Sequence, residues 1–302
     1  MPRTFLNRRH FAFAMVAGGV TIARKISAKP VPVSDLHIES EIGYHRCRTG
    51  AVHFRSVRPA VDSCKTPLLC LHASPGSSRA YTNFLPRMGS DRLTIAADTP
   101  GYGLSDRPSE QSGIADFAGA MGDLMDAMNL QKIDLLGSHT SSATAVELAR
   151  QRPDLVRKIV LNSALLFTPE ELADIRADVA RSQASSLEAA ADQVPERWRR
   201  FRKYRSDLSE EQAWLFFWET NRDPMHQSWG YAAAFDYNFA EALAQTNHPM
   251  LILNPDDVLF PMTKRARDLV RNGKVVNLPW KMGTFGTHSA KVATLIRDFL
   301  EN

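Results

Sequence analysis

The chain contains 302 residues, of which 44% are apolar and 23% charged, and its formal net charge is +4. This length and apolar content suit one large α/β domain with an insertion, and the lack of internal repeats or low-complexity tracts excludes a repeat protein. The three cysteines allow at most one disulfide. We expect Cys70 in the core. The alternatives for the thiols are a bridge between Cys47 and Cys64 or three unpaired cysteines.

The first residues of the chain have the pattern of an export signal. A basic segment that ends in Arg8-Arg9 precedes an apolar run over residues 11–23. Because that run is too short to cross about 30 Å of bilayer at about 1.5 Å per residue, it predicts a signal peptide over residues 1–28. The paired arginines resemble a twin-arginine signal, while a general secretory signal and an uncleaved apolar tail are the alternatives. We expect a periplasmic or secreted protein with no stable membrane anchor after cleavage.

Most of the positive charge belongs to this predicted signal. The segment contains no acidic residue and five basic ones, which are Arg3, Arg8, Arg9, Arg24 and Lys25. Cleavage after residue 28 would therefore change the formal net charge from +4 to −1. Nothing in the remaining chain favours nucleic acid as a partner, so we expect a small-molecule substrate.

Strands alternate with helices along most of the remaining chain. The predicted strands cover residues 51–59, 67–72, 93–98, 132–137, 158–163 and 249–255. Helical spacing is found over residues 114–130, 141–156 and 289–301. Short apolar strands that alternate with helices predict an α/β fold with a mostly parallel, doubly wound sheet.

Two motifs stand where predicted strands end. His72-Ala73-Ser74-Pro75-Gly76 follows one strand, and Asp98 with Pro100, Gly101 and Gly103 follows the next. Open α/β sheets bind ligands outside the carboxyl ends of their strands. The chain here resembles the α/β-hydrolase superfamily, whose members carry an HGxPG-like oxyanion loop followed by a DxPGxGxS segment. Ala73 stands in place of the usual glycine.

The resemblance covers about residues 50–166 and 247–302, and it places a nucleophile at the tip of a strained strand-to-helix turn, GxSxG. This turn needs a very small residue two positions before the tip. His139 at the tip puts Gly137 in that position, whereas Ser138 at the tip would put Leu136 there. We therefore expect histidine at the position where the family has serine. Ser138 remains an alternative nucleophile if the turn rearranges.

Residues 167–246 interrupt the alternation. They contain no convincing strand and four of the five tryptophans. We predict a helical cap between two parts of the core, 29–166 and 247–302, in the position of the family's cap domain. Trp214 and Trp218 are weak candidates for the substrate pocket, with basic residues at its rim for an anionic group. The alternative is an aromatic cap core with a solvated charged face.

The resemblance also implies the other members of the site. Asp257 follows the strand at 249–255 and matches the family's acid, and His288 precedes the last helix, where the family has its base. The oxyanion would be held by the backbone amides of Ser74 and Thr140.

Together His139, Asp257 and His288 would form a non-standard catalytic group. An imidazole at the tip can attack an acyl group itself or activate a water molecule, so we expect a hydrolase that acts on an ester, a lactone or a similar carbonyl substrate. A non-hydrolytic lyase and a non-catalytic ligand-binding member of the fold are the alternatives. We expect no cofactor and no metal, since the remaining histidines lack ligand spacing with one another: His45, His53, His72, His226 and His248.

Overall fold

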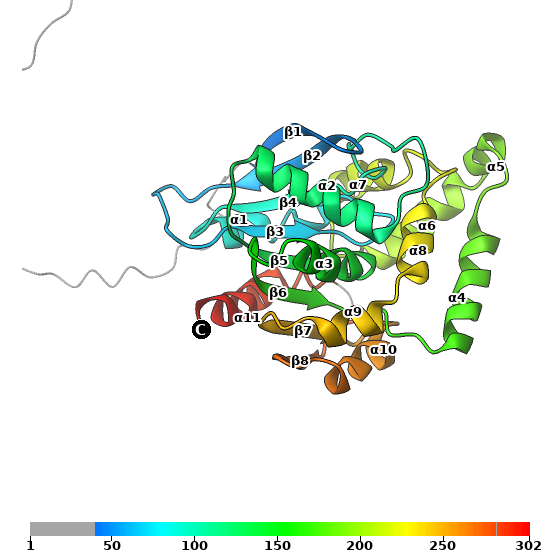
Figure 1. Ribbon diagram of the computed structural model, residues 1–302. Helices are drawn as coiled ribbons and strands as arrows, with labels where there is room; N and C mark the ends of the chain where they lie inside the picture. Colours follow the sequence, from blue (N-terminus) through cyan, green and yellow to red (C-terminus); the bar gives the residue numbers. More distant parts are fainter. Residues whose placement is uncertain (1–39, 282) are drawn as a thin grey trace, which may run out of the picture. The chain divides into compact units, whose positions relative to one another are not determined.

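The computed structural model describes residues 40–281 and 283–302, so the predicted signal over 1–28 lies outside the described residues. Within them, eight strands form one sheet in the order β1-β2-β4-β3-β5-β6-β7-β8 (Figure 1). Its strands are β1 (Glu41–Cys47), β2 (Gly50–Val57), β3 (Leu68–Leu71), β4 (Thr94–Ala97), β5 (Ile133–Ser138), β6 (Val156–Asn162), β7 (Met250–Pro255) and β8 (Gly273–Leu278). β2 pairs antiparallel with β1 and β4, and all other pairs are parallel. The predicted α/β fold class is thereby confirmed.

The central strands are buried on both faces of the sheet. Every residue of β3, β4, β5 and β7 is buried, whereas β1 and β8 at the edges are largely exposed. Continuous apolar runs are typical of parallel strands covered by helices on both sides. The sequence pattern missed the two edge strands because they lack such runs.

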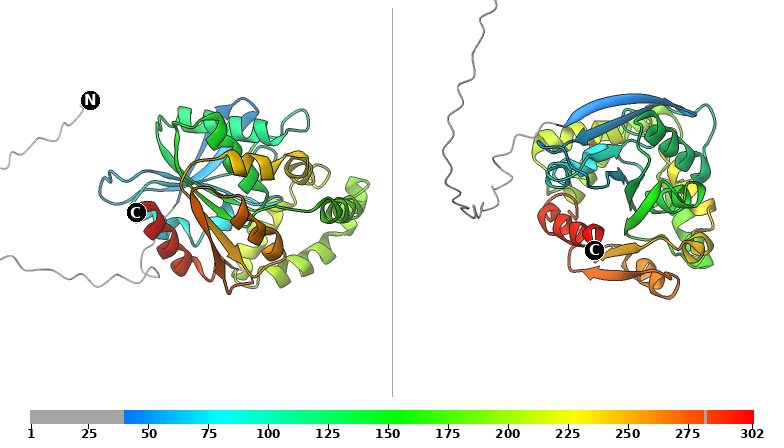
Figure 2. Two further views of the ribbon diagram at one scale, coloured as in Figure 1. Left: turned by 60° about the horizontal axis from the view of Figure 1, so that its bottom comes forward. Right: turned by 60° about the vertical axis from the view of Figure 1, so that its left-hand side comes forward.

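Helices cover the two faces separately. Alternate residues of the central strands pack on α2 (Ile114–Ala127), α3 (Thr140–Gln151) and α9 (Phe239–Gln245). The residues between them face α1 (Leu85–Gly89) and α11 (Ser289–Glu301). Figure 2 shows α11 on the side of the sheet opposite α2 and α3. Because the central strands are parallel, the turns that follow them lie at one edge of the sheet, between the two helical layers.

The segment between β6 and β7 is helical. It contains α4 (Pro169–Ser182), α5 (Leu187–Asp192), α6 (Val194–Tyr204), α7 (Glu210–Thr220), α8 (Trp229–Asp236) and α9. Capping boxes start two of these helices: Thr168 with Glu171 at α4, and Ser209 with Gln212 at α7. We refer to α4–α8 as the cap, and these helices lie beyond one end of the strands in Figure 1.

One acidic side chain ties the cap to the core. Glu219 of α7 accepts hydrogen bonds from Arg79 Nε at 2.5 Å and Ser77 Oγ at 2.8 Å, in the loop after β3. Arg55 Nη2 of β2 approaches the same carboxylate at 3.5 Å. Because Glu219 is largely buried, losing it would leave two arginines facing each other without a counter-ion.

The remaining short elements are η2 (Ser78–Tyr81), α10 (Phe260–Lys264) and η3 (Arg265–Asp268). Cys47, Cys64 and Cys70 are all free thiols, and Cys70 is fully buried as expected. Among the described residues, no helix combines the length and the apolar character needed to span a membrane.

Candidate active site

A cavity of about 1010 Å³ lies between the carboxyl ends of the central strands and the cap. Its core side is formed by the loops after β3, β5, β6 and β7 and by the segment before α11. Residues of these loops in the lining are His72, Ala73, Ser138, His139, Asn162, Asp256, Asp257 and Thr284. The cap adds mainly aromatic and basic side chains, among them Arg197, Phe201, Tyr204, Phe216 and Tyr231. The cap side of the cavity therefore combines aromatic rings with positive charge.

His139 occupies the sharp turn between β5 and α3. Its φ is 51° and its ψ is −117°, a backbone conformation that costs free energy for any residue with a side chain. The turn is held by two backbone bonds, in which the amide of His139 donates to the Asn162 carbonyl and the amide of Ser142 donates to the His139 carbonyl, each at 2.9 Å. A positive φ at His139 agrees with the strained turn expected there from the position of Gly137. The imidazole is one-third exposed and lines the cavity.

The ring of His139 lies against Asp257. The distance from His139 Nε2 to Asp257 Oδ2 is 3.4 Å. The carboxylate is fixed from its other sides, since Ser163 Oγ donates to Oδ2 at 3.2 Å and the Leu259 amide donates to Oδ1 at 2.8 Å. Sequence reasoning missed Ser163, whose only signal is its place directly after β6. The structure thus brings together two of the three predicted catalytic side chains.

His288 does not join this pair. Its ring stacks on Trp280 with a centroid distance of 4.5 Å and an interplanar angle of 11°, and it is not part of the cavity lining. The reason is local: the amide of His288 donates to the Gly283 carbonyl at 2.9 Å, and this turn places His288 at the start of α11. Residues 283–286 face the cavity in its place. The expected contact between His139 and His288 is absent from the described contacts.

Ser138, the alternative nucleophile, lines the cavity as well. Its hydroxyl accepts a hydrogen bond from Asn162 Nδ2 at 3.2 Å. Within residues 40–281 and 283–302, neither an imidazole nor a carboxylate is hydrogen-bonded to Ser138. A serine nucleophile needs such a base, so the contacts favour His139 over Ser138.

One of the two predicted oxyanion donors, the backbone amide of Ser74, already has a hydrogen-bond partner. The amide of Ser74 donates to Thr140 Oγ1 at 2.7 Å. A substrate oxyanion would have to replace this hydroxyl to reach the Ser74 amide. The loop itself is anchored by His72, whose ring accepts from the Thr99 amide at 3.0 Å and lies 2.9 Å from the Ala73 carbonyl. Burial lowers the pKa of His72, which suits a neutral, structural imidazole.

Trp214 and Trp218 are outside the cavity lining, contrary to expectation. They are 49% and 42% exposed, and their rings pack edge-to-face on the outer side of α7. The period of the helix explains the difference, because it turns Phe216 and Phe217 inward instead. These two phenylalanines line the cavity.

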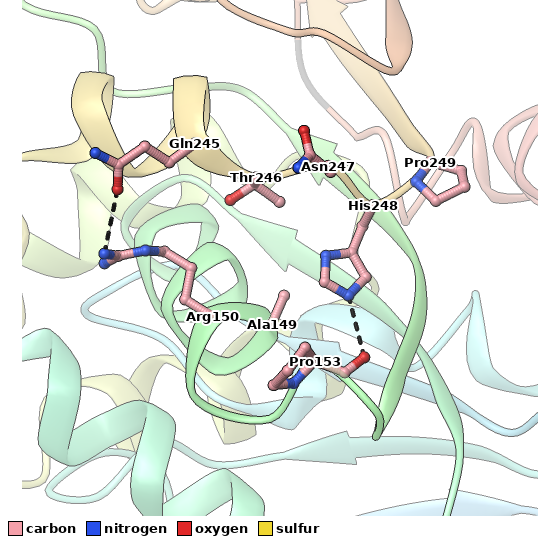
Figure 3. Close-up of a pocket in the computed structure, with 8 residues that line it drawn as sticks. All are labelled: Ala149, Arg150, Pro153, Gln245, Thr246, Asn247, His248 and Pro249. Atoms are coloured by element: carbon pink, nitrogen blue, oxygen red, sulfur yellow. Dashed lines mark hydrogen bonds between the residues drawn. The ribbon is translucent and has the colours of Figure 1, made fainter.

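A second pocket of about 590 Å³ lies at the opposite edge of the sheet, where the parallel strands begin (Figure 3). Two of its polar side chains already have partners: Arg150 Nη2 donates to Gln245, and His248 Nε2 lies 3.3 Å from the Pro153 carbonyl. None of the predicted site residues is here. Nowhere in the described part of the chain do three His, Cys, Asp or Glu side chains form a cluster that could hold a metal ion.

Comparison with known proteins agrees with the fold. A family model described as alpha/beta hydrolase fold matches residues 66–264. A 2-hydroxymuconate semialdehyde hydrolase from Pseudomonas sp. (strain CF600) is 32% identical over 100 residues, which cover 32% of this chain and 35% of that protein. A proline iminopeptidase from Heyndrickxia coagulans is 29% identical over 106 residues, covering 34% of this chain and 37% of that protein. The match thus spans only about a third of these relatives' length.

Solved structures extend the likeness to nearly the whole fold. The epoxide hydrolase CorEH superposes with a TM-score of 0.71 at 17% identity, covering 87% of this chain and 99% of that one. The enol-lactonase from Burkholderia xenovorans LB400 gives a TM-score of 0.69 at 17% identity, covering 86% and 100%. At such identities the likeness concerns the fold alone.

Proposed function

The chain belongs to the α/β-hydrolase family, and we propose that it is a hydrolase acting on an ester, a lactone or a similar carbonyl substrate. The observation that carries the proposal is the pair formed by His139 and Asp257. His139 stands at the positive-φ turn after β5, where the family's nucleophilic serine is expected, and its ring contacts a carboxylate after β7. Both side chains line a cavity that is large enough for a small or medium substrate.

In the proposed step His139 acts as a general base. When Nε2–H donates to Asp257, the lone pair of Nδ1 is left to accept a proton from water. The water oxygen bonds to the carbonyl carbon, the carbonyl π electrons move to oxygen, and Asp257 stabilises the imidazolium. Collapse of the oxyanion then breaks the bond to the leaving oxygen, which takes the proton back from His139. The amides of Ser74 and Thr140 are the proposed oxyanion donors, and His288 has no part in the step.

Hydrolysis of activated esters and lactones by wild type and by Asp257→Asn tests the proposal. We expect wild type to hydrolyse 4-nitrophenyl esters or lactones in H₂¹⁸O with label entering the acid product. Asp257→Asn should lower kcat at least about tenfold, since an amide neither orients the ring in the same way nor stabilises its cation.

The neighbouring Asp256→Asn is the matched control, because Asp256 is exposed and, in the described part of the chain, Asp257 rather than Asp256 pairs with His139. Equal kcat in wild type and Asp257→Asn would contradict the assigned pair. Turnover without ¹⁸O incorporation would indicate the lyase alternative. Ligand binding without any turnover would indicate a binding member of the fold.

We also propose that residues 1–28 direct export by the twin-arginine route. The support is the sequence alone, in which Arg8-Arg9 precedes a short apolar run. A fusion of residues 1–30 to a reporter that must fold before export should reach the periplasm, and Arg8→Lys with Arg9→Lys should block it. Unchanged export of the double variant would point to the general secretory route.

A further inference from the structure

The cap presents to the cavity a guanidinium without an acidic partner. Arg197 of α6 donates to the Gln193 side-chain oxygen at 2.8 and 3.2 Å and approaches the Asn221 oxygen at 3.4 Å. With its amide turned, Gln227 adds a third neutral oxygen at 2.7 Å. No carboxylate lies within 4.0 Å of Arg197 in the described part of the chain. Three neutral oxygens therefore hold the group in place but leave its charge uncompensated.

Two neighbouring arginines of the cap have acidic partners, whereas Arg200, which is exposed, has none among the described residues. Arg199 pairs with Glu196 on the outer face of α6, and Arg205 pairs with Asp207 at 2.9 Å. Burial together with the charge of Arg200 lowers the pKa of Arg197. A partly buried cation without a counter-ion is costly, so its retention beside the cavity calls for an anion that arrives with the ligand.

The charge of the whole cavity also favours an anionic ligand. Its lining contains four basic side chains, which are Arg197, Arg200, Arg205 and Lys281, and two acidic ones, which are Asp256 and Asp257. Asp257 faces His139 and Asp207 already compensates Arg205. The excess positive charge is thus on the cap, while the proposed reacting centre is on the core side of the same cavity.

Aromatic rings line the same cavity as Arg197. Phe201, Phe216 and Phe217 pack edge-to-face with centroid distances of 5.6 Å for both pairs that include Phe201, and all three line the cavity. Such a surface favours an apolar body, and a planar guanidinium favours a carboxylate that accepts two parallel hydrogen bonds. We propose that Arg197 is the anion-recognising residue of this cavity and that the ligand is an apolar molecule with a free carboxylate. The identification of this ligand as the substrate of an ester or lactone hydrolase rests on the proposed function.

Binding of a matched pair of probes tests the proposal without any need for turnover. Calorimetric titration should show that the wild-type protein binds 4-phenylbutyrate at least about tenfold more tightly than 4-phenylbutanamide, which has the same shape without the charge. Arg197→Gln should abolish most of this preference and leave the affinity for the amide unchanged. Arg197→Lys, which keeps the charge but loses the planar fork, should retain part of it.

Arg199→Gln is the control, because Arg199 lies on the same helix, is exposed and is outside the lining. Equal affinity for both probes in wild type would overturn the proposal, as would full preference in Arg197→Gln or an equal loss in Arg199→Gln. If circular dichroism shows that Arg197→Gln does not fold, Arg197→Lys alone tests the proposal. An unchanged preference for 4-phenylbutyrate over 4-phenylbutanamide in Arg197→Lys would then overturn the bidentate contact.

A kinetic comparison separates this proposal from the proposed function. Mono-4-nitrophenyl glutarate carries a free carboxylate, and 4-nitrophenyl pentanoate is its neutral counterpart. We expect Arg197→Gln to raise KM about tenfold or more for the first and to leave KM for the second unchanged. Carboxylate-selective binding without hydrolysis of either ester would overturn the proposed hydrolase activity but not the proposed anion site. Hydrolysis of both esters with equal KM would overturn the anion site but not the hydrolase activity.

Discussion

Replacing His139 with alanine is expected to lower kcat for ester or lactone hydrolysis by a factor on the order of 10² to 10⁴, which is the usual effect of losing a positioned acid–base group. Alanine keeps the turn after β5 small but removes the only imidazole that contacts Asp257 among the described contacts. Steady-state kinetics with a 4-nitrophenyl ester gives the value directly. KM should change much less than kcat, because the aromatic lining of the cap is unaffected.

His139→Ser distinguishes a histidine mechanism from a displaced serine mechanism. Serine at the tip would recreate the family's nucleophile, but His288 stacks on Trp280 outside the cavity lining and is not placed to act as its base. We therefore expect His139→Ser to be as inactive as His139→Ala. His248→Ala, in the pocket at the opposite edge of the sheet, is the control and should keep full activity. Equal activity in wild type and both His139 variants would overturn the assignment and move attention to Ser138.

The fold was predictable because its signals are local. Apolar runs marked the buried strands, and the small residue Gly137 two positions before His139 fixed the register of the turn. The edge strands β1 and β8 escaped prediction because strand pairing, rather than an apolar run, defines them. Local sequence patterns therefore predict the core strands, whereas the edge strands form by pairing with neighbouring strands, which no local pattern identifies.

The site was predictable only in part, for a related reason. Asp257 follows a strand directly, so its position could be inferred from the order of strands. His288 is separated from β8 by a loop, and a single backbone turn from Gly283 moves it out of the cavity. Arg197 lies on a cap helix whose packing decides which of several arginines faces inward. Side chains fixed by the sheet can be predicted, and those fixed by tertiary packing cannot.

Gly137→Ala is expected to destabilise the fold at the turn that presents His139. A Cβ at this position would lie 2.5 Å from the Ser141 carbonyl oxygen and 2.8 Å from Ala145 Cβ, closer than van der Waals contact allows. Since β5 and α3 cross here, relief requires the helix to move, and we expect a loss of about 1–3 kcal/mol in the free energy of unfolding. The melting temperature should fall by several degrees, and activity should fall with it because the same movement displaces His139.

Gly122→Ala is the matched control, because it makes the same change within α2. Its Cβ would meet its nearest neighbours, Arg152 Nη1 and a Leu148 methyl, at 3.5 and 3.7 Å, which is ordinary contact. Alanine in a helix interior is favoured over glycine by about 0.5–1 kcal/mol, so this variant should melt at or above the wild-type temperature. Thermal unfolding followed by circular dichroism compares the two. If Gly137→Ala melted like Gly122→Ala, the close crossing of β5 and α3 would be contradicted, and with it the strained turn that presents His139 to the cavity.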